Sequence, residues 1–201
     1  MEWLIPVPEL HIDQVQIGNI THTAKPLIPL SYKEEDHMFP SLSILLPSLK
    51  IKSFDPLTGH FVISLVENPS TLAKLQGLQD MLLAHIKSKY TSWFPNQRLN
   101  IKKIVDIKTG FQPLIHGNEL HLYCPIQAQI AQSVPFYSKG TWSSTGIQTG
   151  LLTPGSKIRI VLRIQGISFH IHQTTGQWTG KFRIQHKLLA LLMPTVTAVP
   201  S

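Results

Sequence analysis

A stretch near the C-terminal end of the chain alternates between apolar and polar residues, and it constrains the fold more than any other feature. In residues 157–165, aliphatic side chains at every second position face one way, while Lys157, Arg159 and Arg163 face the other. A period of two is the pattern of a β-strand that is buried on one face only. Gly166 interrupts this pattern and predicts a bulge or a sharp bend.

The alternation resumes after Gly166 and then reverses at a turn. Phe169 and its neighbouring isoleucines alternate with Ser168, His170 and His172, and residues 173–176 (QTTG) predict a hairpin turn. In the return strand, residues 178–192, apolar residues alternate with Lys181 and Arg183. The sequence therefore predicts a long, bent hairpin that carries basic residues.

Charge is divided unevenly along the chain. The first 119 residues hold 11 Lys or Arg and 11 Asp or Glu, and the last carboxylate is Glu119. The whole formal charge of +7 therefore lies in residues 120–201. Such a segment attracts anions, and nucleic-acid backbones are the commonest large anions. The alternative is that the charge only keeps the chain soluble, but the aromatic residues among the cations favour nucleic acid.

The composition is that of a folded chain. Apolar residues make up 42% and charged residues 14% of the 201 residues, which suffices for a core. The only cysteine, Cys124, excludes an internal disulfide, so we expect an intracellular, reducing compartment. We expect no membrane partner, because no apolar run reaches the roughly 18 residues of a span and no signal-peptide layout is present.

The rest of the chain predicts short strands around one helix. Residues 1–40 hold five prolines and predict an irregular N-terminal arm or an edge-covering strand, with residues 3–5 packed on the body or on a second subunit. Residues 41–66 and 101–124 predict strands. Asn68 as N-cap, Pro69 in the first turn and leucines at helical spacing predict a helix over residues 68–90. Residues 125–150 predict a long, mobile loop, and residues 193–201 a flexible tail.

Cations and flat rings in or near one hairpin suit single-stranded nucleic acid, because cations meet phosphates and rings stack on bases of any sequence. Trp142 and Trp178, which lie beside turns, are the better stacking candidates, whereas the alternation makes Phe169 and Phe182 better suited to the core. Cations at and after the helix end extend the track: Lys87, Lys89, Lys102 and Lys103. The candidate binding residues are Lys139, Lys157, Arg159, Arg163, Lys181, Arg183, Lys187, Tyr137, Trp142, Phe169, Trp178, His170 and His172.

Metal binding and catalysis are less well supported. His170 and His172 together with His121, His186 and Cys124 invite a zinc site, but their spacing matches no strong zinc pattern. A two-metal nuclease or polymerase needs clustered carboxylates, which residues 120–201 lack. The sequence also has no phosphate-binding glycine loop and no nucleophile elbow. We therefore expect no metal, no cofactor and no enzymatic activity.

Two segments and the single helix between them resemble a known family. Residues 40–49 (PSLSILLPSL) and 154–169 (PGSKIRIVLRIQGISF) look like the single-stranded DNA-binding proteins of large double-stranded DNA viruses and related mobile elements. In that family a basic late strand is followed by a glycine and then an aromatic-containing strand, and here Gly166, Ile167 and Phe169 match those positions. The resemblance implies an OB-fold, a five-stranded barrel that binds DNA across its face.

The chain departs from the family in two places. It ends without the acidic tail that recruits replication partners, and it has Ile164 or Phe169 where the family often has a stacking tryptophan. The expectation is a mainly β chain with one long helix: an arm (1–40), an OB-fold-like barrel (41–192) and a tail (193–201). Its expected role is sequence-independent coating of single-stranded DNA in replication or repair, in a host nucleus or cytoplasm if it is viral.

Two matters stay open at this point. The partners expected are single-stranded DNA, with RNA as an alternative, further copies of the chain, and replication proteins. The alternative function is a structural or assembly protein, a β-sandwich of a virion or movement complex, whose basic face contacts nucleic acid loosely.

Overall fold

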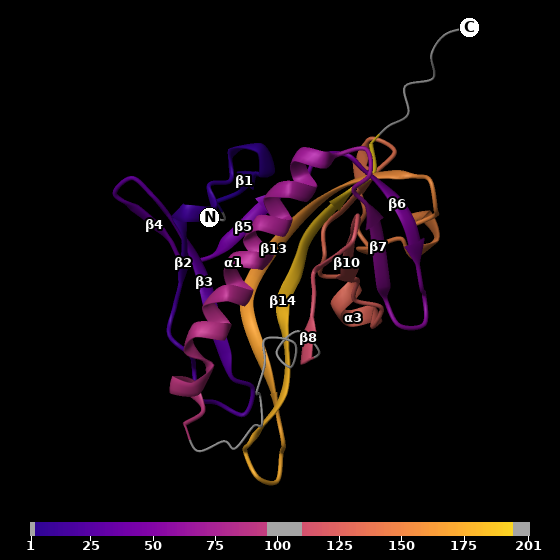
Figure 1. Ribbon diagram of the computed structural model, residues 1–201. Helices are drawn as coiled ribbons and strands as arrows, with labels where there is room; N and C mark the ends of the chain where they lie inside the picture. Colours follow the sequence, from indigo (N-terminus) through magenta and orange to yellow (C-terminus); the bar gives the residue numbers. More distant parts are fainter. Residues whose placement is uncertain (1–2, 96–109, 195–201) are drawn as a thin grey trace, which may run out of the picture.

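The computed structural model describes residues 3–95 and 110–194, which form a mainly β protein with one long helix (Figure 1). The helices are α1 (Pro69–Trp93) and the short α3 (Ala128–Ala131), with three 3₁₀ turns at Val7–Glu9, Ile12–Gln14 and Thr149–Leu151. The strands are β1 (Ile5–Pro6), β2 (Val15–Ile17), β3 (Leu27–Glu34), β4 (His37–Phe39), β5 (Leu42–Leu45), β6 (Leu49–Phe54), β7 (His60–Ser64), β8 (Phe111–Gln112), β9 (Ile115–His116), β10 (Glu119–Tyr123), β11 (Phe136–Ser138), β12 (Thr141–Trp142), β13 (Lys157–Ile171) and β14 (Trp178–Leu192).

The two longest strands, β13 and β14, pair antiparallel and form the axis of the sheet (Figure 1). The predicted bulge at Gly166 is confirmed, because the register shifts between Ile164 and Gly166. A Cβ at Gly166 would lie 1.9 Å from the carbonyl oxygen of Ile28, and the φ of Gly166 is +147°. Only glycine therefore lets β3 approach β13 this closely.

The other strands extend the sheet in both directions from this hairpin. Its order is β12-β11-β14-β13-β6-β7-β10-β9, with β5 and β3 also paired to β13 and β8 paired to β14. The sheet is open: among the described residues no backbone ladder joins β10 to β14. A hydrogen bond from the backbone N–H of Tyr123 to Nε2 of His186 (3.0 Å) links the two strands instead. We call this junction the seam.

Helix α1 lies across the long strands in Figure 1 and buries one stripe of side chains. Leu75, Leu78, Leu82 and Ile86 follow the spacing of a helix face and are buried. Asn68 occupies the N-cap position as predicted, but its side chain makes no capping hydrogen bond. The helix runs three residues beyond the predicted end, to Trp93.

Two segments are more regular than an arm and a loop. The N-terminal segment forms β1 to β4 and buries Val7, Leu10 and Tyr32 in the common core, so of the two alternatives the strand packed on the body is confirmed and the irregular arm is wrong. Residues 125–150 contain α3, β11 and β12, and Phe136 of β11 is fully buried beside β14. Pro29 lies inside β3 opposite Gly166, at the bulge of β13, which is one of the places in a sheet where proline is tolerated. Most of the predicted tail lies outside the described residues.

No helix of the described ranges is long and apolar enough to cross a membrane.

Candidate nucleic-acid interface

The two faces of the β13–β14 hairpin differ sharply in chemistry. Directly paired residues of two strands point to the same face. The inner face carries the pairs Leu162–Leu188, Ile167–Ile184 and Phe169–Phe182 and is buried. This face is turned toward α1, because Trp93 and Phe94 at the helix end contact Phe169. The opposite face, which we call the outer face, carries the polar partners.

Predicted cations lie together along the outer face. Arg163 is paired with Lys187, and Arg183 is paired with Ser168, whose Oγ accepts a 3.4 Å hydrogen bond from Arg183 Nε. Arg159 and Lys181 lie on this face too, because the neighbouring residues Ile160 and Phe182 in the same strands are buried on the inner face. We call these five residues the basic strip: Arg159, Arg163, Lys181, Arg183 and Lys187.

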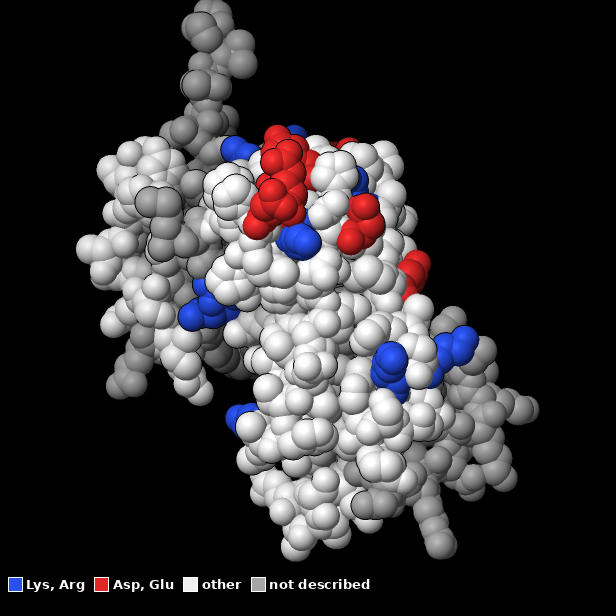
Figure 2. Space-filling model, turned by 90° about the vertical axis from the view of Figure 1, so that its left-hand side faces the viewer, with Lys and Arg blue, Asp and Glu red and all other residues white. Residues whose placement is uncertain are grey.

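Among the strands that pair with β13 or β14, only β3 contains a carboxylate: Glu34, at the end of β3 away from its pairing with β13. The sequences of β5, β8, β11, β12, β13 and β14 contain no Asp or Glu. The acidic residues that the structure describes lie elsewhere, and Glu34, Glu35 and Asp36 are exposed at the β3–β4 turn. Figure 2 shows acidic residues gathered on the upper part of one side of the molecule, with Lys and Arg side chains beside them. The outer face therefore keeps its positive field.

An exposed aromatic pair lies at the β12 end of the strip. Strands β11 and β12 are joined by Lys139 and Gly140, both with positive φ, as a tight hairpin turn requires. Trp142 is 56% exposed and contacts Tyr137 edge to face at 5.2 Å between ring centroids. Trp142 and Arg159 line the same surface hollow of about 500 Å³, together with Leu4, Val161, Leu189 and Leu192. The ring and the cation thus border the same hollow, with Tyr137 and Leu192 between them in the cross-strand row.

Two predicted stacking residues need correction. Trp178 is 2% exposed and Phe169 4%, and both lie in an aromatic cluster with Phe94 and Phe182. The indole N–H of Trp178 donates to the carbonyl of Lys181 at 2.8 Å. Alternation places both rings on the inner face, so neither presents a surface to a base. The prediction that Phe169 and Phe182 belong to the core is confirmed.

The other predicted residues lie at the margins of the outer face. Lys157 is exposed at the start of β13, opposite Lys50 of β6. His170 is exposed and its Nδ1 lies 3.0 Å from Thr179 Oγ1, while His172 lies in the hairpin turn. Lys87 and Lys89 are exposed on α1, across the sheet from the strip, and Lys102 and Lys103 lie outside the described residues.

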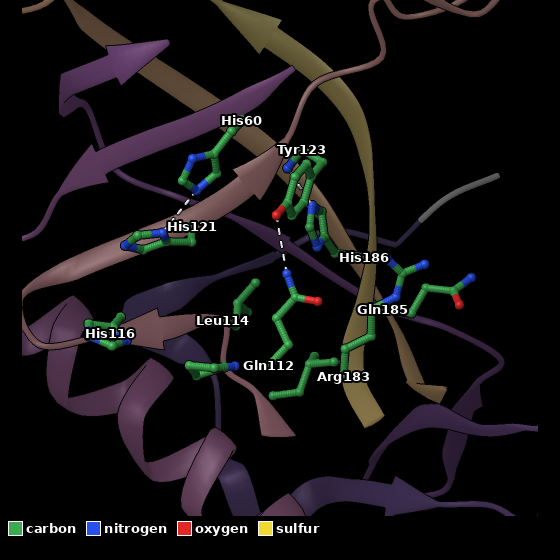
Figure 3. A pocket seen from close by; sticks show the side chains of 11 residues that line it. His60, Gln112, Leu114, His116, His121, Tyr123, Arg183, Gln185 and His186 are labelled. Carbon is green, nitrogen blue, oxygen red and sulfur yellow. Dashed lines mark hydrogen bonds between the residues drawn. The ribbon is translucent and has the colours of Figure 1, made fainter. Parts of the chain in front are cut away.

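A second hollow, of about 390 Å³, opens at the seam (Figure 3). We call it the seam hollow. The rings of His60 and Tyr123 lie 5.4 Å apart between centroids and are tilted by 31°, and those of Tyr123 and His186 lie 6.4 Å apart and are stacked at 23°. Gln112 Nε2 donates to the hydroxyl of Tyr123 at 3.1 Å. Three rings in a row are thus held beside an amide.

The seam hollow is continuous with the basic strip. Gln112, Pro113, Arg183 and Gln185 line both this hollow and a neighbouring one of about 630 Å³. The neighbouring hollow, which we call the hairpin hollow, is also lined by Lys25, Lys181 and His170. A path along β8 and β14 therefore connects Lys181 to the rings at the seam.

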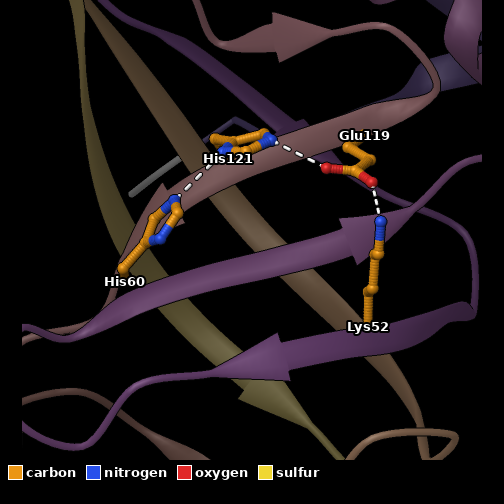
Figure 4. A network of polar contacts seen from close by, with 4 residues as sticks. All are labelled: Lys52, His60, Glu119 and His121. Carbon is orange, nitrogen blue, oxygen red and sulfur yellow. Dashed lines mark hydrogen bonds and ion pairs between the residues drawn. The ribbon is translucent and has the colours of Figure 1, made fainter.

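A chain of polar contacts supports the wall of the seam hollow (Figure 4). His60 Nε2 lies 3.0 Å from His121 Nδ1, and His121 Nε2 lies 3.1 Å from Glu119 Oε2. Lys52 forms an ion pair with the other carboxylate oxygen of Glu119. The hydrogen bond from Lys52 lowers the pKa of Glu119, with a smaller contribution from His121, so this carboxylate remains charged.

His186 plays a structural part at the seam. Burial lowers its pKa to about 4, and the positive charge of Arg183 acts in the same direction. The ring is therefore neutral near pH 7, so Nε2 accepts the hydrogen bond from Tyr123. Within residues 3–95 and 110–194, no three His, Cys, Asp or Glu side chains are grouped as a metal site would need.

The sequence analysis named Arg183 of the seam hollow as a binding residue and His121 and His186 only as possible zinc ligands, and it missed His60, Gln112 and Tyr123. Residues 119–123 (ELHLY) alternate between polar and leucine side chains, which indicates a strand with Glu119, His121 and Tyr123 on one exposed face. That pattern was available from the sequence. Its position beside β14 was not, because it depends on the long-range pairing of β7 with β10.

No protein-family model matches the chain, and no curated protein matches it.

Proposed function

We propose that this protein binds single-stranded DNA on the outer face of the β13–β14 hairpin and catalyses no reaction. Phosphates would contact the basic strip, and bases would stack on Trp142 and Tyr137. The strip supplies charge without sequence readout, so binding would be independent of base sequence. RNA is the alternative strand, since both polymers have the same phosphates and stacking bases.

The observation that carries the proposal is the strand register. Cross-strand pairing places Arg163 with Lys187, and Arg183 with Ser168, on the face that also carries Arg159 and Leu192 beside Tyr137. If the register were shifted by one residue on one strand, half of these cations would point into the core. The cations and the exposed indole of Trp142 thus share one surface, as a track for a flexible polyanion requires.

We further propose that the sheet is an OB-fold barrel opened at the seam. Strands β14, β13, β6, β7 and β10 follow one another in the sheet order, which gives the five neighbouring strands that such a barrel needs. The Tyr123–His186 hydrogen bond supports the proposal, because it holds β10 near β14 where a ladder would close the barrel.

The proposal is tested by titrating fluorescently labelled oligonucleotides with the purified protein. Single strands, duplexes and RNA of equal length should be compared at about 50 and 200 mM salt, since both charge and stacking depend on the strand's form. We expect the single strand to bind at least tenfold tighter than the duplex. Equal affinity for both would contradict the proposal and favour an assembly protein with a basic surface.

A further inference from the structure

We propose that the seam hollow binds a single nucleotide, with its base against Tyr123 and its phosphate at Arg183. This inference deepens the proposed function and rests on it for the source of the ligand, which is either one unit of a bound strand or a free nucleotide. In the strand case, the hollow would hold one base apart from the others. The seam hollow would then add a defined subsite to an otherwise uniform track.

The ring arrangement points to a flat ligand. Tyr123 is 44% exposed, and it is flanked by His60 at 5.4 Å and His186 at 6.4 Å between ring centroids. The hydrogen bond from Gln112 fixes the orientation of the phenol, and the backbone of Tyr123 is tied to His186. An aromatic ring that is held in place yet accessible loses little conformational freedom when a base stacks on it.

The polar groups around these rings suit the edge of a base. Gln112 and Gln185 line the hollow, and side-chain amides offer both a donor and an acceptor to base edges. Gln185 Nε2 donates a 3.2 Å hydrogen bond to Gln165 Oε1. This contact orients the side-chain amide of Gln185, including its carbonyl oxygen. The volume of about 390 Å³ lies in the range of small-ligand sites.

The phosphate position follows from the continuity of the two hollows. Arg183 borders both the seam hollow and the hairpin hollow, and Lys181 lines the latter. A guanidinium beside a stacking ring is the arrangement that holds a base and its phosphate together. The ion pair of Glu119 with Lys52 neutralises the nearest carboxylate of β10, which would otherwise repel a phosphate.

The experiment measures binding of deoxynucleoside monophosphates by titration calorimetry, with deoxyribose 5-phosphate and inorganic phosphate as probes that lack the base. Tyr123→Leu removes the platform, and Tyr90→Leu on α1, a half-buried tyrosine outside the outer face and the seam hollow, is the matched control. His60→Leu is a second variant, should Tyr123→Leu fail to fold. We expect Tyr123→Leu to weaken nucleotide binding roughly 5- to 100-fold, and Tyr90→Leu to leave it unchanged.

The proposal is overturned if deoxyribose 5-phosphate binds as tightly as the nucleotides, or if the two tyrosine variants lose nucleotide binding equally. It is also overturned if Tyr123→Leu leaves nucleotide binding at the wild-type level.

The source of the ligand is read from oligonucleotide binding. If Tyr123→Leu weakens oligonucleotide binding as well, the subsite holds a base of the strand. A second result would separate the two proposals: Tyr123→Leu weakens mononucleotide binding alone, and an oligonucleotide binds the wild-type protein no tighter than a mononucleotide does. In that case the nucleotide subsite is supported and the strand-coating function is contradicted.

Discussion

Replacing His186 with glutamine should make the stability of the protein less dependent on pH. Glutamine places its carbonyl oxygen near the position of Nε2, so the hydrogen bond from the backbone of Tyr123 at the seam is preserved. The substitution removes the imidazole that accepts this hydrogen bond. The variant therefore measures the effect of protonating residue 186 while the contact between β10 and β14 is kept.

The magnitude follows from the pKa of His186, which burial lowers from 6.5 to about 4. Between these two values the unfolded chain binds a proton that the folded protein excludes, so the free energy of unfolding falls as the pH falls. Each pKa unit corresponds to about 1.4 kcal/mol. The full shift is therefore worth at most about 3.5 kcal/mol of unfolding free energy, and this contribution is complete above pH 6.5.

Urea denaturation at pH 7.0, 5.5 and 4.5 measures this effect. The wild type should lose more stability than His186→Gln over this range, by about 2 to 3 kcal/mol. His172→Gln, in the exposed hairpin turn, is the control and should follow the wild type. Parallel pH profiles for the wild type and His186→Gln would refute the reasoning, because they would show that His186 titrates alike in both states.

The remaining predictions concern packing, stacking and the thiol. Gly166→Ala should destabilise the protein by roughly 3 kcal/mol in urea denaturation, because the new Cβ would meet the carbonyl oxygen of Ile28; unchanged stability would contradict the bulge geometry. Trp178→Ala should lower the free energy of unfolding by about 3–5 kcal/mol, because its ring is buried. Trp142→Ala should lower it by less than about 0.5 kcal/mol and should weaken oligonucleotide binding by about 1–3 kcal/mol, because its ring is exposed. The reverse pattern would contradict the assignment of the two rings. Burial raises the pKa of the Cys124 thiol to about 12. A thiol reagent at pH 8 should therefore react slowly with the native protein and quickly with the protein in denaturant. Fast labelling of the native protein would argue against this burial.

The sequence was most informative where the pattern is local and regular. The hairpin over residues 157–192, its bulge at Gly166 and the single helix each follow from spacing within one segment. The partition of the hairpin into a basic and an apolar face was also predictable, because a strand has a period of two. Trp178 was misjudged because its place beside a turn suggested exposure, whereas Tyr90 of α1 and Phe94, which follows the helix, contact its ring and help to bury it.

Features that depend on distant segments could not be predicted. Residues 125–150 are rich in polar residues, yet Phe136 and Val134 are buried because β11 pairs with β14. The seam hollow combines His60, Tyr123 and His186 from three strands, so no local pattern could show it. Closure of the barrel is likewise a property of the whole sheet, and the structure leaves that sheet open.

The salt dependence of oligonucleotide binding tests the central claim most directly. Each phosphate contact that a single strand makes contributes about 0.7 to the slope of log K against log salt. Removing two cations of the basic strip in Arg159→Ala/Arg163→Ala should therefore flatten the slope by about 1.4. The matched control is Lys87→Ala/Lys89→Ala on α1, which should keep the wild-type slope. An unchanged slope in the arginine variant, or equal flattening in both variants, would contradict a strand bound along the outer face.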